Sequence, residues 1–138
     1  APVERPSVYN WLTNEKEIRD ALENIVEGLI FDVEHNVLWR AEWGVRPATA
    51  AEREAVVRRQ VASAPKLAPI FMHRHLVLEP CRSGNPVLSI HQSDVIVYGG
   101  ELRTYLLTEF EDLTGMRPSK LTRLPDEWMH IPFWGGFL

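Results

Sequence analysis

Residues 69–110 read PIFMHRHLVLEPCRSGNPVLSIHQSDVIVYGGELRTYLLTEF. This segment holds the densest apolar runs of the chain, so we expect the core to form around it. Apolar runs at residues 67–71 and 76–78 lie on either side of the polar HRH triplet and predict two strands joined by a loop. After the glycine pair YGG, apolar side chains recur at helical spacing and predict a helix over residues 101–110.

Two further strands are predicted between the loop PCRSGNP and that helix. In VLSIH, residues 87–91, strict alternation places Leu88 and Ile90 on one face and the odd-numbered residues on the other. The segment VIVY, residues 95–98, is rich in β-branched and aromatic side chains. The central part of the chain therefore predicts a sheet followed by a helix.

The N-terminal third predicts a helix and then a strand. Asn14 precedes a repeat of apolar side chains at helical spacing, which predicts a helix over residues 15–27 with Gly28 as its C-cap. The next residues, LIFDV at 29–33, form a short run of large apolar side chains and predict a strand that ends at a turn near His35. The residues from Val37 onward would begin the returning strand.

A second helix is predicted over residues 51–64, AEREAVVRRQVASA. Thr49 and Glu52 have the spacing of a capping box, and Pro65 ends the helix because it cannot continue the hydrogen-bond ladder. The C-terminal residues from Glu111 onward are rich in Pro, Gly and aromatic side chains, and we expect them to pack back against the sheet. The five tryptophans are interpreted mainly as core residues.

Size and composition favour one domain over residues 1–138, with 45% apolar and 25% charged residues. The net charge of −4 disfavours direct nucleic-acid binding and favours a basic protein partner. No apolar run is long enough to span a membrane, and the start of the chain has no signal-peptide layout, which we interpret as a processed or trimmed start. The single cysteine, Cys81, is expected to be buried and fits a cytoplasmic location.

Several ordered motifs resemble the SUKH superfamily, the Smi/Knr type of bacterial proteins. They are FDVEHNVLW, the RP after Trp43, APIFMHRHLVLEP, GNPVLSIHQSDVIVYGGELRTYLLTEF and IPFW, and the similarity covers roughly residues 29–134. The resemblance implies a single α+β domain, with a mixed or antiparallel sheet packed by about three helices. It also implies a non-enzymatic role without cofactor or metal, because bacterial members are commonly immunity proteins that bind and neutralise toxin domains, often nucleases.

The candidate partner-binding residues lie on or beside the predicted strands: His73, Arg74, His75, Gln92, Asp94 and Tyr98. Polar groups held rigidly at a sheet edge suit a recognition surface. Turn capping by Ser93 or Asp94 and backbone hydrogen bonds from Gln92 explain the same residues structurally.

Two other functions stay open at this stage. Asp32, Glu34, His73 and His75 contain the ligand types of a small metal-dependent hydrolase, and Cys81 or His91 would complete a zinc site with the histidines. Structural roles are favoured for these residues, since no second ligand pair recurs and no P-loop, nucleophile elbow or CxxC pair is present. A regulatory scaffold domain is the third interpretation.

Overall fold

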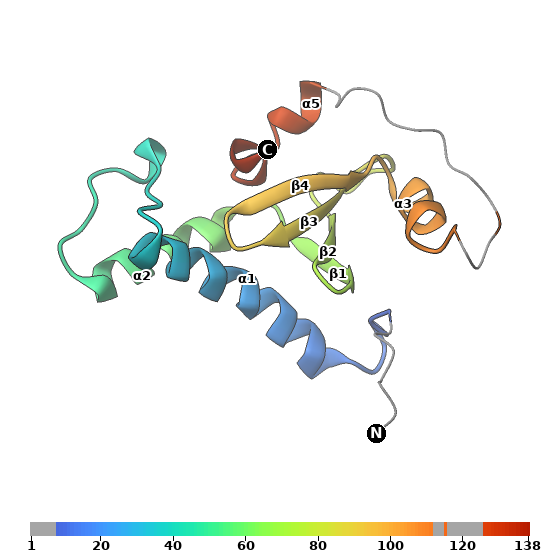
Figure 1. The fold of residues 1–138 in the computed structure, drawn as a ribbon, viewed down its shortest axis with the longest axis horizontal. Helices are drawn as coiled ribbons and strands as arrows, with labels where there is room; N and C mark the ends of the chain where they lie inside the picture. The colour runs from blue at the N-terminus through green and yellow to red at the C-terminus, as the bar shows by residue number, and fades with distance from the viewer. Residues whose placement is uncertain (1–7, 112–114, 116–125) are drawn as a thin grey trace.

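The computed structural model describes residues 8–111, 115 and 126–138. In this part of the chain, helices accompany one four-stranded sheet whose order is β1-β2-β3-β4, with every neighbouring pair antiparallel (Figure 1). The predicted α+β class is therefore confirmed, and the sheet is a simple up-and-down meander. The strands are β1 (Leu67–Phe71), β2 (Arg74–Val77), β3 (Val87–His91) and β4 (Asp94–Gly99).

Helix α1 (Glu15–His35) is longer than its sequence pattern predicts. The strand predicted at residues 29–33 is wrong, because Leu29 and Val33 extend the helical repeat of buried side chains begun by Ile18 and Ile25. The expected C-cap at Gly28 is wrong as well, since this residue lies inside the helix. No strand begins at Val37, whose φ of 59° ends the regular backbone.

Helix α2 (Ala50–Ser63) begins where the capping box predicts. The Thr49 hydroxyl accepts a hydrogen bond from the Glu52 backbone N–H, and the Glu52 carboxylate accepts one from Thr49. Only Val56 and Val57 of this helix are buried, which matches its narrow apolar stripe. The helix ends before Pro65, as expected.

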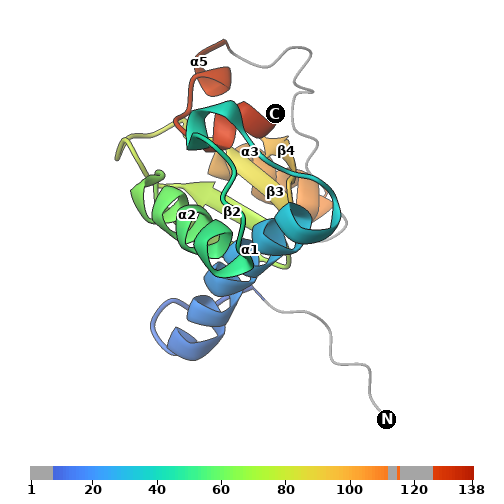
Figure 2. The ribbon, with the colours of Figure 1, turned by 90° about the vertical axis from the view of Figure 1, so that its left-hand side faces the viewer.

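The helices cover the sheet on two faces. Helices α1 and α2 lie side by side in front of the strands in Figure 2 and share a core with Leu88 and Ile90 of β3. Helix α3 (Leu102–Glu109) packs on the other face, where Tyr105 meets Val87. The alternation predicted for β3 is confirmed for Val87 and Leu88, which enter different cores, whereas His91 at the end of the strand lines the same groove as Ile90.

The C-terminal residues return to the sheet, as predicted. After α5 (Asp126–Met129), the 3₁₀ helix η2 (Trp134–Phe137) contacts β4, and the Trp134 indole N–H donates to the Pro65 carbonyl at 2.8 Å. The earlier part of that tail, residues 112–114 and 116–125, lies outside the described residues. A second 3₁₀ helix, η1 (Ala41–Trp43), brings Trp43 into the core.

Most of the tryptophans are core residues, as expected: Trp43, Trp128 and Trp134 are buried and Trp39 packs against the core, whereas Trp11 is half exposed. Cys81 was expected inside and is exposed, because it lies in the loop between β2 and β3 beyond the end of the sheet. Within the described ranges, no helix combines the length and the apolar character needed to cross a bilayer.

Gly99 marks the closest approach between β4 and α3. A Cβ added at Gly99 would lie 2.6 Å from the Tyr105 Cβ and 2.9 Å from the Tyr105 Cα. We therefore expect Gly99→Ala to lower the free energy of unfolding by about 1–3 kcal/mol, measured by urea denaturation. Ser83→Ala, in an exposed loop, serves as the control and should change it by less than about 0.5 kcal/mol. Equal stability of the two variants would contradict this packing.

Candidate functional site

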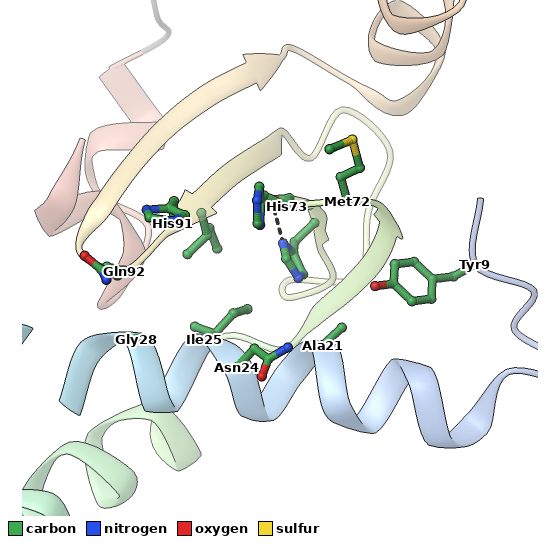
Figure 3. A pocket seen from close by; sticks show the side chains of 11 residues that line it. Tyr9, Ala21, Asn24, Ile25, Gly28, Met72, His73, His91 and Gln92 are labelled. Atoms are coloured by element: carbon green, nitrogen blue, oxygen red, sulfur yellow. Dashed lines mark hydrogen bonds between the residues drawn. The ribbon is translucent and has the colours of Figure 1, made fainter. Parts of the chain in front are cut away.

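A groove of about 520 Å³ lies between α1 and the turns at one end of the sheet (Figure 3). We call it the α1 groove. Helix α1 forms its floor with Ala21, Asn24, Ile25 and Gly28. The sheet and the N-terminal segment supply the remaining lining residues: Tyr9, Met72, His73, His75, Ile90, His91 and Gln92.

Three histidines meet in the α1 groove. His73 belongs to the turn between β1 and β2, and its ring meets the His91 ring edge to face, with 5.4 Å between the ring centroids. His75 on β2 is buried, and its Nδ1 lies 2.9 Å from the His73 carbonyl oxygen. Because a carbonyl only accepts hydrogen bonds, Nδ1 carries the proton and Nε2 is the acceptor. That buried Nε2 has no hydrogen-bond partner.

The electrostatics of His75 follow from its position. Burial lowers the pKa of this imidazole to about 4, since the charged form would lose its hydration. The neighbouring His73 carbonyl acts in the opposite direction but more weakly. His75 therefore stays neutral at physiological pH, and its buried Nε2 keeps a free lone pair.

The turn between β3 and β4 is fixed to α1 by one buried carboxylate. Asp32 accepts hydrogen bonds from the Ser93 backbone N–H at 2.8 Å and the Ser93 hydroxyl at 2.6 Å, and its other oxygen accepts from Asn36 at 2.6 Å. Burial alone would raise the pKa of Asp32, but these hydrogen bonds outweigh it and hold the pKa below its ordinary value. This contact places Gln92 against Gly28 at the end of the groove.

Asp32 and Glu34 do not share a strand face, contrary to expectation. Both lie on α1, and Glu34 forms a two-pronged ion pair with Arg53 of α2, with both N–O distances 2.6 Å. The Arg53 hydrogen bonds lower the pKa of Glu34. Across the part of the chain that the structure describes, no group of three or more His, Cys, Asp or Glu side chains has the arrangement to hold a metal ion. The exposed Cys81 lines a different hollow from the histidines.

The six candidate partner-binding residues divide between two faces of the sheet. His73, His75 and Gln92 line the α1 groove. Arg74 lies on the opposite face, with its guanidinium 3.8 Å from the centre of the Tyr98 ring and 3.9 Å from Glu109. Asp94 is exposed at the start of β4.

Sequence reasoning missed a set of exposed apolar side chains in the N-terminal segment and the β1–β2 turn. Its members, here called the apolar rim, are Val8, Trp11, Leu12 and Met72, which are 46%, 52%, 94% and 49% exposed. The N-terminal segment lies along β1, because the Tyr9 N–H donates to the Ile70 carbonyl at 2.9 Å and the Trp11 indole donates to the Pro69 carbonyl at 3.0 Å. The only sign of these exposed side chains in the sequence was the apolar pair Trp11 and Leu12, which precedes α1 and is not part of its helical repeat.

Comparison with known proteins adds no relative: no family model, curated protein or solved structure matches this chain. Geometry and chemistry alone therefore define the class of site. It is an open groove on an α+β fold, with exposed apolar side chains in the N-terminal segment and the β1–β2 turn.

The low pKa of His75 makes stability depend on pH. The unfolded chain takes up a proton at this imidazole near pH 6.5, whereas the folded protein does so only near pH 4. Protonation therefore favours unfolding between these values, and stability should fall as pH decreases from 6.5 to 4, by about 3 kcal/mol at most. Urea denaturation at several pH values measures this loss, which should be absent from His75→Gln. The exposed His130 offers the control, and His130→Gln should keep the wild-type slope.

Removing the Asp32 carboxylate should detach the β3–β4 turn from α1. Asp32→Ala leaves the half-buried Ser93 N–H and the Asn36 amide without their acceptor, so we expect a loss of about 2–3 kcal/mol in the free energy of unfolding. Asp94→Ala alters an exposed carboxylate in the same turn and should change it by less than about 0.5 kcal/mol. A loss of the same size in both variants would show that Asp32 does not hold the turn.

Proposed function

We propose that this chain is a protein-binding module of the SUKH immunity type, which binds and neutralises a basic toxin domain in the cytoplasm. The observation that carries the proposal is the apolar rim. Trp11, Leu12 and Met72 expose large apolar side chains, and Met72 also lines the α1 groove. Aromatic residues and methionine are enriched in protein interfaces. Neutralisation would be steric, with the toxin's active surface covered by the bound module.

Trp11 has the properties of an interface anchor. Its indole N–H is held by the Pro69 carbonyl, so the ring is oriented before binding and loses little conformational freedom on binding. About half of the residue remains exposed, which leaves apolar area for a partner to cover. Tryptophans in this state are the commonest hot spots of protein interfaces.

The charge of the neighbouring helices favours a basic partner. Helices α1 and α2 together carry nine Asp and Glu side chains but only five Lys and Arg. An excess of negative charge speeds association with a basic surface, and salt screens this effect.

The metal-dependent hydrolase is the weaker alternative. Its proposed ligands Asp32 and Glu34 already have protein partners in Ser93 and Arg53. A regulatory scaffold would use the same rim and groove, and only the identity of the bound protein separates it from the immunity function.

The test begins with capture of partners from a lysate of the source organism and their identification by mass spectrometry. The expected partner carries a basic toxin domain, binds the purified protein and loses its toxicity when the two are produced together in cells. Cell-envelope or regulatory proteins in its place would favour the scaffold function and contradict the immunity function.

Matched variants then test the apolar rim with the purified partner. Leu12 and Val45 are both 94% exposed, but Val45 lies in the loop after η1, away from the rim. We expect Leu12→Lys and Trp11→Ala each to weaken binding, Trp11→Ala by at least about 30-fold, measured by calorimetry. Val45→Lys should bind as the wild type does. Rim variants with unchanged affinity would place the interface elsewhere.

Ionic strength tests the electrostatic part separately. The association rate should fall as salt rises, while the dissociation rate changes little. An association rate that is independent of salt would remove steering from the proposal and leave the apolar contact intact.

A further inference from the structure

The lining of the α1 groove contains no carboxylate, ammonium or guanidinium group. None of its eleven residues is Asp, Glu, Lys or Arg. A cationic ligand would find no carboxylate there, and an anionic ligand would find no ammonium or guanidinium group. The groove therefore favours an uncharged occupant, since an ion would lose hydration without gaining a counter-charge.

The groove also offers one buried acceptor without a donor. His75 is only 3% exposed, and its Nε2 has no hydrogen-bond partner, while its Nδ1–H is used by the His73 carbonyl. Leaving a buried acceptor unpaired is costly, so a ligand that donates to it gains more than an ordinary surface hydrogen bond would supply. Because burial keeps this imidazole neutral, the lone pair is available at physiological pH.

The remaining groups suit the edges and faces of an aromatic ring. Figure 3 shows His73 and His91 above the floor formed by α1, with Tyr9 at the opposite end, whereas the Met72 side chain points away from this floor. The His73 and His91 rings already pack edge to face. Aromatic rings interact favourably with a further ring placed against them.

We propose that the α1 groove binds an uncharged aromatic ring that carries an O–H or N–H group, which donates its hydrogen bond to Nε2 of His75. Such a ring has two sources: a small phenol or indole, or the Tyr or Trp side chain of a protein partner. The inference rests on the proposed function only for the second source. The first requires no partner at all.

The experiment is an NMR titration of the whole chain with pairs of probes that differ in the donor. Phenol is compared with anisole, and indole with 1-methylindole, since each second compound keeps the ring but lacks the donor. Phenol or indole should shift the backbone amide signals of groove residues such as Asn24 and Gln92. The probe without the donor should bind at least about tenfold more weakly.

Variants at His75 assign the acceptor. Asn places an amide N–H near the position of Nδ1 and has no atom at Nε2, whereas Gln places an amide oxygen near Nε2. His75→Asn should therefore remove the difference between phenol and anisole, and His75→Gln should keep most of it. Thermal unfolding confirms that both variants are folded.

A second pair of variants tests the location without altering His75. Ala21→Phe should fill the groove and abolish binding of phenol, whereas Ala62→Phe, on the exposed surface of α2, should leave it unchanged. These substitutions keep the test valid even if His75→Asn does not fold.

Each outcome has a defined meaning. No shift of groove signals with either phenol or indole at millimolar concentration overturns the inference, as does equal binding of phenol and anisole. Tighter binding of N-acetyl-tyrosinamide than of phenol identifies a partner side chain as the source, and the reverse order identifies a free small molecule. Since no partner is present in these titrations, failure of the immunity function would not affect them.

Discussion

The buried carboxylate of Asp32 joins the two halves of this structure. It lies near the end of α1 and binds Ser93 in the β3–β4 turn, 61 residues later in the chain. Burial of an ion is costly unless its oxygens are satisfied, and here both oxygens have donors. This contact sets the distance between the helix and the sheet, and the α1 groove occupies the space that remains between them.

The sheet was predictable because its signals are local. The apolar runs at residues 67–71 and 87–91 are short and bounded by turn residues, and the strands β1 and β3 form at these positions. The glycine pair at residues 99–100 correctly predicts that a helix, α3, follows. The error at residues 29–33 has a physical cause. Five consecutive residues cannot distinguish a strand from one turn of a buried helix by periodicity alone, and here packing against α2 and the sheet decided the outcome.

The candidate site was predictable only in part. His73 and His75 were identified as a pair, but the contact of His73 with His91 depends on the register of β2 and β3, which no single segment encodes. Arg74 and Tyr98 were grouped with them, although strand alternation turns Arg74 to the opposite face. The apolar rim was missed because it requires residues near the N-terminus to lie along β1, a contact between positions about 60 residues apart.

That same contact determines what can happen at the edge of the sheet. An unpaired edge strand is a template for additional strands, which is a route to aggregation and to binding of extended peptides. Here the segment around Tyr9 and Trp11 occupies two carbonyls of β1, and Pro69 removes a backbone donor from the strand. A partner can reach the rim side chains, but it cannot extend the sheet at β1 without first displacing the segment that carries them.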